Sequence, residues 1–203
     1  MSSIIIPGEV GAPKFDDRLH QYTFNGRVVP SVSAILQPLT AMAYGGIDAQ
    51  VLLTAARLGT AVHACTEYLD EGELDEATVD PEWAPYLDAY KAWKAAIRPE
   101  ILGIELRLAC SKFGGTIDRI VKIDGQLWIV DLKTTSQIHK HVGVQLAAYA
   151  ALAEKHLRTT GFRRAALQLR PDGTFKVREF SSITDETCFN ALLGIHYWQE
   201  STK

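Results

Sequence analysis

A two-residue turn between two apolar segments most restricts the fold of this chain. Asp124 and Gly125 separate the segments 115–123 and 126–133. Asp-Gly favours the tight turn of an antiparallel hairpin, because both positions of that turn require positive φ. The flanking segments are rich in β-branched residues, as expected of strands. The turn therefore predicts two neighbouring antiparallel strands, and a further strand is predicted just before them at 103–111.

Helical and hairpin patterns surround these strands. Apolar residues recur at helical spacing in four segments: about 48–70, PEWAPYLDAYKAWKAAI, HVGVQLAAYAALAEKHL and TDETCFNALLGIHYWQE. Gly59 is a possible interruption of the first, Gly72 its expected end, and Thr184 the expected cap of the last. Two further hairpins are expected, one around Asn25-Gly26 and one between 163–170 and 174–180. Ser31 is expected to cap a short helix, and residues 1–20 are interpreted as an irregular arm.

The order of elements after residue 100 is β-β-β-α-β-β-α, and a mostly helical half precedes it. This order predicts an α/β (α+β mixed) fold with a central mixed sheet flanked by helices. We predict one domain over 1–203, with an N-terminal arm, hairpin and helices over 1–100 and an αβ core over 101–203.

The amino-acid composition argues against several classes of function. The net charge is −3, so no overall basic field indicates nucleic acid, and a DNA-binding surface would have to be local. The three cysteines are widely spaced without a CxxC pair, which argues against a disulfide framework or a cysteine-held metal and favours a reducing cytoplasm. No apolar run is long enough to cross a membrane, and the N-terminus does not resemble a signal peptide.

The strand that ends in "WIVDLKTTSQ" carries the strongest chemical signal. Side chains alternate along a strand, so Asp131 and Lys133 share one face. Asp118 lies about as far from the turn as Asp131, which places the two carboxylates nearly opposite each other. Two close carboxylates repel unless a cation lies between them, and their oxygens suit Mg²⁺ or Mn²⁺. A lysine beside such a cation is the arrangement that phosphodiester hydrolysis needs.

Two further residues extend this group, and each candidate also has an ordinary structural explanation. Glu105 lies on the preceding strand, and His63 lies on a helix in "LGTAVHACTEYLD". The D-x-K spacing occurs by chance in most chains, and Asp118 can form a surface ion pair with Arg119. A histidine on a helix is more often structural than a ligand, and Glu105 can be solvated.

The motifs taken together resemble the PD-(D/E)XK nuclease superfamily, and within it the RecB-like, phage-type exonuclease branch. "GGTIDRI" resembles the strand with the metal-binding aspartate, "IVDLKTT" the D/E-x-K strand, and "VQLAAYA" the Q-x-x-x-Y motif of the next helix. "GTAVHACTEYLD" resembles the upstream helix whose histidine is an extra metal ligand. "HQYTFNGRVVPSVSAIL" resembles the leader of phage members. The match spans roughly residues 20 to 155 and implies a restriction-endonuclease-like core.

The resemblance implies a role for each site residue. The implied catalytic residues are Asp118, Asp131, Lys133, Gln145 and Tyr149. The implied metal ligands are His63, Asp118, Asp131, the backbone carbonyl of Leu132 and, with a looser motif, Glu105. The candidate DNA contacts are Thr134, Thr135, Arg119 and Lys140, and more loosely Arg163, Arg164, His139 and His141. For Gln145 and Tyr149 the alternative is a helix that packs Tyr149 into the core and leaves Gln145 exposed.

The expected function is a Mg²⁺- or Mn²⁺-dependent exonuclease that hydrolyses DNA from its ends in phage or bacterial recombination or repair. The cysteine cluster of some relatives is missing, so no iron–sulfur cluster is expected. The sequence has no nucleotide-binding GxxxxGK[ST] motif, so a helicase, recombinase or single-strand-binding partner would be another chain. The alternatives are a DNA-binding module of the same fold without turnover, and an interaction protein whose acidic residues form surface ion pairs.

Overall fold

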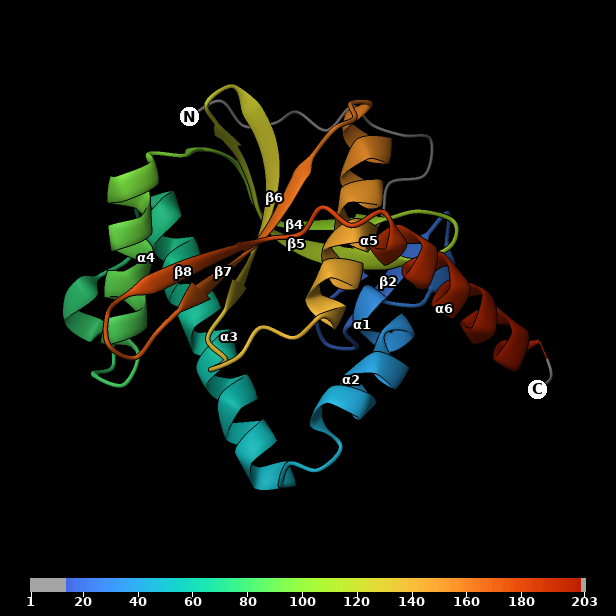
Figure 1. The fold of residues 1–203 in the computed structure, drawn as a ribbon, viewed down its shortest axis with the longest axis horizontal. Helices are drawn as coiled ribbons and strands as arrows, with labels where there is room; N and C mark the ends of the chain where they lie inside the picture. Colours follow the sequence, from blue (N-terminus) through green and yellow to red (C-terminus); the bar gives the residue numbers. More distant parts are fainter. Residues whose placement is uncertain (1–13, 202–203) are drawn as a thin grey trace.

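The computed structural model describes residues 14–201 (Figure 1). Its centre is a five-stranded sheet in the order β4-β5-β6-β7-β8. The strands are β4 (Glu100–Ala109), β5 (Gly114–Ile123), β6 (Gln126–Lys133), β7 (Arg163–Leu169) and β8 (Phe175–Glu179). Only β6 and β7 are parallel, and the other neighbours are antiparallel. The mixed α/β fold predicted from the order of elements is therefore confirmed.

The hairpin predicted at Asp124-Gly125 joins β5 to β6. Ile123 pairs with Gln126, and both Asp124 (φ 49°) and Gly125 (φ 80°) adopt the positive φ that this tight turn requires. The parallel neighbours need a longer connection, which α5 (His141–Leu157) supplies by crossing from the end of β6 to the start of β7.

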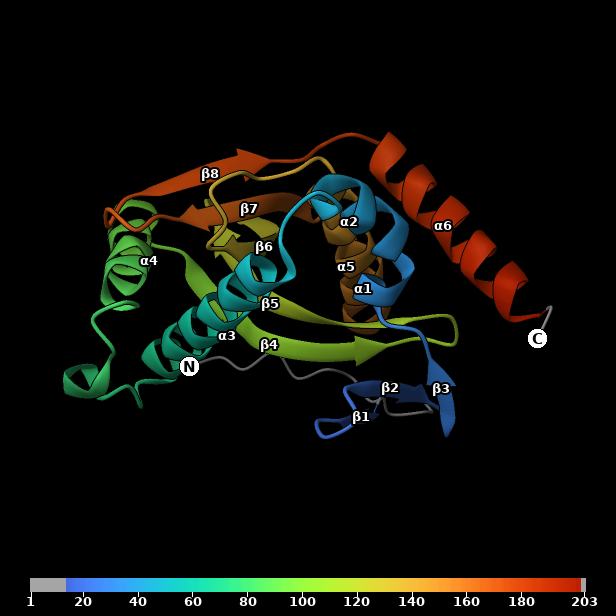
Figure 2. The same cartoon turned by 90° about the horizontal axis from the view of Figure 1, so that it is seen from below.

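Helices cover both faces of the sheet (Figures 1 and 2). On one face, α1 (Val32–Ile35), α5 and α6 (Thr184–Glu200) pack on a core that includes Ile129 of β6. On the other, α3 (Ala49–Glu71) and α4 (Ala84–Ile97) pack on a second core that includes Val130 and Leu132. Consecutive residues of β6 thus enter opposite cores, as strand alternation requires. Within the described part of the chain, none of the helices has the length and hydropathy needed to span a bilayer.

Several local expectations are refined by the structure. α3 runs without a break through Gly59 and ends where Gly72 takes the left-handed conformation (φ 78°). Ser31 caps α1 through a bond from the Ala34 N–H, as expected, whereas α6 begins one residue earlier than expected, with Ile183 in the capping position. A separate helix, α2 (Gln37–Tyr44), follows α1, and a 3₁₀ turn, η1 (Glu76–Thr78), precedes α4.

The expected N-terminal arm is partly a strand. β1 (Lys14–Asp16) pairs with β2 (Gln21–Phe24), which forms the expected hairpin with β3 (Arg27–Val29), and together they make a small sheet beside β4 and β5. Residues 1–13 of the arm lie outside the described residues.

Candidate active site

The end of β6 presents a carboxylate and an ammonium group side by side on the face covered by α5. Asp131 is 1% exposed, and its Oδ2 atom lies 2.7 Å from Nζ of Lys133. Burial lowers the pKa of Lys133, but the carboxylates of Asp131 and Asp118 outweigh it and raise that pKa above its usual value. Lys133 is therefore protonated at neutral pH, and its position is set by Asp131.

Two residues in the N-terminal half of α5 extend this contact away from the sheet. Nζ of Lys133 donates to Oε1 of Gln145 at 3.3 Å, and Nε2 of Gln145 donates to the hydroxyl of Tyr149 at 3.0 Å. Tyr149 is buried against Gly115 of β5, where an added Cβ would lie 2.8 Å from the tyrosine ring. The second glycine of "GGTIDRI" is thus explained by the close approach of Tyr149, and Gln145 faces Lys133 rather than solvent.

A second group of ligand-bearing side chains converges from three separate elements. His63 of α3, Glu105 of β4 and Asp118 of β5 each offer one ligand atom, and these atoms lie within 4.8 Å of one another. Nδ1 of His63 lies 3.6 Å from Oε1 of Glu105 and 3.7 Å from Oδ2 of Asp118. Asp131 is outside this group, since its carboxylate lies with Lys133.

The backbone of Leu132 fixes the geometry of this group. Its N–H donates to Oδ2 of Asp118 at 2.7 Å, and its carbonyl oxygen lies 3.1 Å from Nε2 of His63. When Nε2 donates to that carbonyl, Nδ1 faces the two carboxylates and would be the ligand atom for a metal that displaces its proton. A histidine that ligates a metal is oriented in this way in many proteins. The Leu132 carbonyl, expected as a metal ligand, contacts His63 in this arrangement.

Glu105 reaches the site from a distorted point of β4. It has φ 45°, a left-handed conformation that is uncommon for a residue other than glycine. Its neighbours Ile104 and Leu106 pair with β5, but Glu105 itself interrupts the ladder opposite Asp118. Such strained positions are concentrated at functional sites, and this one directs a carboxylate toward His63.

The charges of the group are mutually dependent. Burial lowers the pKa of His63, but the nearby carboxylates of Asp118 and Glu105 more than offset it and raise that pKa to about 9. Burial raises the pKa of Asp118, which His63 lowers and Glu105 raises further. Burial also raises the pKa of Asp131 to about 6 against the opposing effect of Lys133. A protonated imidazole therefore compensates the two carboxylates at neutral pH.

These residues fit a divalent cation. Two carboxylates and one imidazole are donors that bind ions such as Mg²⁺ and Mn²⁺. Burial, and to a smaller extent Glu105, raises the pKa of Asp118, so a bound cation would stabilise its ionised form. His63, Glu105 and Asp118 would hold the ion, with Asp131 and Lys133 beside it. A groove of about 450 Å³ opens onto His63 and Glu105, so the group is reachable from the surface.

Arg119, expected at a DNA-binding surface, is instead fully buried (0% exposed). Its guanidinium donates to Asp70 at 2.7 Å, to the Thr66 hydroxyl at 3.1 Å and to Glu105 at 3.3 Å, and it packs near the ring of Tyr90. The expectation was wrong because neighbouring strand residues point to opposite faces. Arg119 links α3 and α4 to the back of the metal group, and DNA cannot contact it there.

The other predicted DNA contacts, Thr134, Thr135 and Lys140, lie on the segment between β6 and α5. Thr134 is half-buried at the end of β6, and Thr135 donates to the carbonyl of Gln137 at 3.0 Å. Lys140 is exposed just before α5.

The two arginines that were proposed more loosely as DNA contacts, Arg163 and Arg164, already bind other residues of the protein. Arg163 pairs with Glu179 at 2.6 Å and lies over the Trp128 ring at the opposite end of β6 from Lys133. Arg164 donates to the carbonyls of Gly143 and Ser182. Neither arginine is therefore placed to line the active site.

Sequence reasoning missed several residues near this site. Tyr44 packs edge-on against His139 and His141, with ring centroids at 5.0 and 5.6 Å. Asp70 and Tyr90 hold Arg119 from α3 and α4. No local pattern marks these residues, and only the helical spacing of Tyr90 indicated burial.

A mixed sheet with a D-x-K strand at its centre, an acidic residue on the neighbouring strand and flanking helices defines a restriction-endonuclease-like core. Residues 80–192 match the PD-(D/E)XK nuclease superfamily, and the chain belongs to this superfamily. The matched segment contains Asp118, Asp131 and Lys133 but not His63, whose place in the site rests on geometry alone. The superfamily indicates a metal-dependent nuclease with DNA as substrate. No individual curated protein matches the chain.

Proposed function

We propose that this protein is a Mg²⁺- or Mn²⁺-dependent exonuclease of the RecB-like branch that hydrolyses DNA from its ends. One observation carries the proposal: the group of His63, Glu105 and Asp118 meets the Asp131–Lys133 pair at the end of β6. The contact of His63 with the backbone of the D-x-K strand supports the RecB-like assignment, because that branch resembles this chain in its upstream histidine helix.

The chain's own residues have distinct tasks in the proposed reaction. Asp118, Glu105 and His63 would hold the divalent cation, with Asp131 and the Leu132 carbonyl next to them. When bound, the divalent cation supplies positive charge and an acidified water for attack on phosphorus. Lys133 contacts a non-bridging oxygen of the scissile phosphate and stabilises the charge that develops there. Asp131 and Gln145 hold the ammonium in position, and Tyr149 holds Gln145.

Thr134 and Lys140 are the proposed DNA contacts. Both lie on the segment that leaves the catalytic strand and enters α5. An exonuclease of this kind would act in recombination or repair in the cytoplasm of a bacterium or a phage-infected cell. A recombinase, helicase or single-strand-binding protein would be a separate chain that presents the DNA end.

The test is digestion of end-labelled linear DNA, single- and double-stranded, beside closed circular DNA. Reactions contain Mg²⁺, Mn²⁺ or EDTA and compare the natural protein with Lys133→Met. Lys112→Met is the matched control, because Lys112 is exposed in the turn between β4 and β5.

We expect metal-dependent loss of linear DNA, preservation of circles, and no cleavage by Lys133→Met while Lys112→Met is fully active. Cleavage of circles would make the enzyme an endonuclease. Cleavage by Lys133→Met at the natural rate would refute the assigned centre. Tight DNA binding without product in either metal would leave a binding module.

A further inference from the structure

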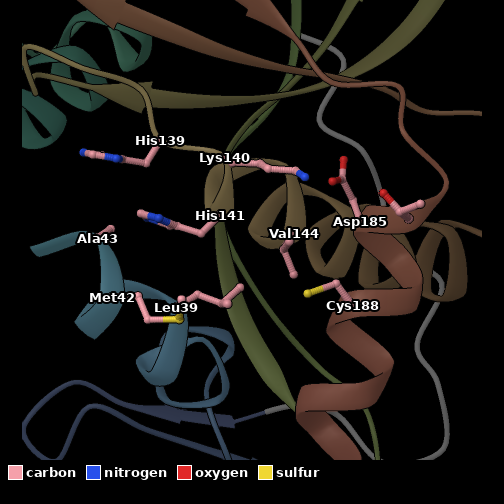
Figure 3. Close-up of a pocket in the computed structure, with 10 residues that line it drawn as sticks. Leu39, Met42, Ala43, His139, Lys140, His141, Val144, Asp185 and Cys188 are labelled. Carbon is pink, nitrogen blue, oxygen red and sulfur yellow. The ribbon is translucent and has the colours of Figure 1, made fainter.

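A cavity separate from the metal group lies where three helices meet (Figure 3). It has a volume of about 510 Å³, within the range of roughly 300–1,000 Å³ that is common for ligand pockets. Its apolar walls are Leu39, Met42 and Ala43 of α2, Val144 of α5 and Cys188 of α6. Met42 is 84% exposed, so a large apolar side chain is left in water at the cavity.

Aromatic and cationic groups line the side of this cavity formed by the start of α5. The rings of His139 and His141 are nearly parallel (11°) and project away from α6, whereas Lys140 projects toward Asp185 (Figure 3). Tyr44 of α2 closes against both histidine rings. Among the residues that the structure describes, Lys140 takes part in no ion pair, and the positive end of the α5 dipole lies beside it.

The start of α5 joins the cavity to the catalytic centre, because Val144 lines the cavity and the next residue, Gln145, accepts a hydrogen bond from Lys133. Burial lowers the pKa of His141, and His139 and Lys133 lower it further. Burial raises the pKa of Tyr44, whereas Lys133 acts to lower it. The charge of Lys133 thus acts on both rings, and through Gln145 and Val144 a DNA strand held at Lys133 would have this cavity as its neighbour.

We propose that this cavity receives one unpaired nucleobase of the DNA strand that occupies the active site. The proposal rests on the proposed nuclease function and specifies its substrate. The flat apolar face of a base can pack against the apolar walls and stack on the rings of His139 and His141. Stacking of a base on an aromatic ring does not depend on which base it is. Lys140 suits the phosphate attached to that base. A cavity of about 510 Å³ lined by three helices has room for a base but not for a duplex, so the strand must be unpaired at this point.

The experiment is an abasic scan. A labelled single-stranded oligonucleotide is prepared as a series in which one residue at a time lacks its base, and affinity for the full chain is measured by fluorescence anisotropy in EDTA. We expect affinity to fall at least about fivefold at one or two adjacent positions and little elsewhere, because one stacked base contributes that much.

Two variants connect the result to the cavity. Ala43→Trp fills the cavity and His139→Ala removes part of its aromatic wall, and each should abolish the dependence on position. Ala96→Trp is the matched control on the exposed surface of α4, behind the opposite face of the sheet, and should retain it. Circular dichroism and thermal unfolding verify that each variant is folded.

Each other outcome overturns the proposal. A uniform loss across the scan, or a position-dependent loss that persists in Ala43→Trp, would show that no base occupies the cavity and would favour an apolar side chain of a protein partner. Because the scan is performed without metal, it is independent of cleavage. If the scan is uniform but Mg²⁺-dependent digestion is normal, only the base-binding proposal is refuted. If DNA binding and digestion are both absent, the proposed nuclease function is refuted as well.

Discussion

The imidazolium of His63 should act as an internal counter-ion that stabilises the metal-free protein. Its pKa rises from 6.5 to about 9 on folding, because the carboxylates of Asp118 and Glu105 outweigh the effect of burial. A group whose pKa is higher in the folded state than in the unfolded state stabilises the fold at pH values below its unfolded pKa. This contribution is fully present below about pH 6.5 and is lost as pH rises through about 9.

The size of the effect follows from the same values. At 1.36 kcal/mol per pKa unit, the change from 6.5 to about 9 corresponds to at most about 3 kcal/mol. For a chain of 203 residues, 1 kcal/mol corresponds to roughly 2–4 °C in melting temperature. The metal-free protein should therefore lose up to about 3 kcal/mol, or about 6–12 °C, between pH 6.5 and pH 9.5.

The assay is urea and thermal unfolding in EDTA at several pH values, for the natural protein and for His63→Gln. The variant lacks the titrating ring, so the difference between the two proteins isolates His63 from every other group. Added Mn²⁺ must displace the proton from the ring, so its affinity should rise by up to about tenfold per pH unit between 6.5 and 9. Equal loss of stability in both proteins, or pH-independent Mn²⁺ binding, would refute the reasoning.

Three further substitutions test the packing around the site. Gly115→Ala should destabilise the fold by about 1–3 kcal/mol, because the added Cβ would lie 2.8 Å from the Tyr149 ring; chemical unfolding measures this. Arg119→Met should cost about 1.5–3 kcal/mol, because it removes the buried guanidinium that binds Asp70 and leaves this carboxylate with only Lys94 and Tyr90 as partners. Asp131→Asn should abolish metal-dependent cleavage. In the natural protein, the free energy of unfolding should fall as pH rises from about 4 to about 6, because the buried Asp131, with its raised pKa, ionises less easily in the folded state. Asp131→Asn should remove this fall.

Each of these three predictions has a result that contradicts it. A Gly115→Ala protein as stable as the parent would mean that the tyrosine is free to move away. An Arg119→Met protein with normal stability would show that Lys94 and Tyr90 are sufficient partners for Asp70. An Asp131→Asn protein that retains cleavage, or that shows the same stability profile from pH 4 to 6 as the parent, would remove Asp131 from the centre.

Local chemistry allowed much of the fold to be predicted. The Asp124-Gly125 turn needs positive φ at both residues, which only a few residue types adopt easily, and that requirement defined the β5–β6 hairpin. The hairpin register then placed Asp118 near Asp131, because the strand period is two and the turn determines the pairing. The bounds of α5 followed equally from its continuous apolar pattern.

Other features of the site depend on contacts between residues far apart in sequence. His63 reaches the backbone of Leu132 across 69 residues, and no local pattern specifies that meeting. Strand alternation turns Arg119 away from Asp118, but only the packing of α3 and α4 supplies Asp70 as its partner. The unusual φ of Glu105 likewise arises where β4 bends to meet two other elements.

The sequence by itself therefore determined which strands carry the chemistry and which of their faces they present, because turn geometry and residue periodicity are properties of short segments. Only the tertiary structure decided how the imidazole, the two carboxylates and the lysine are arranged as one charge-compensated centre, because that depends on which helices pack against each face of the sheet. The cavity beside it, between α2, α5 and α6, has the same origin.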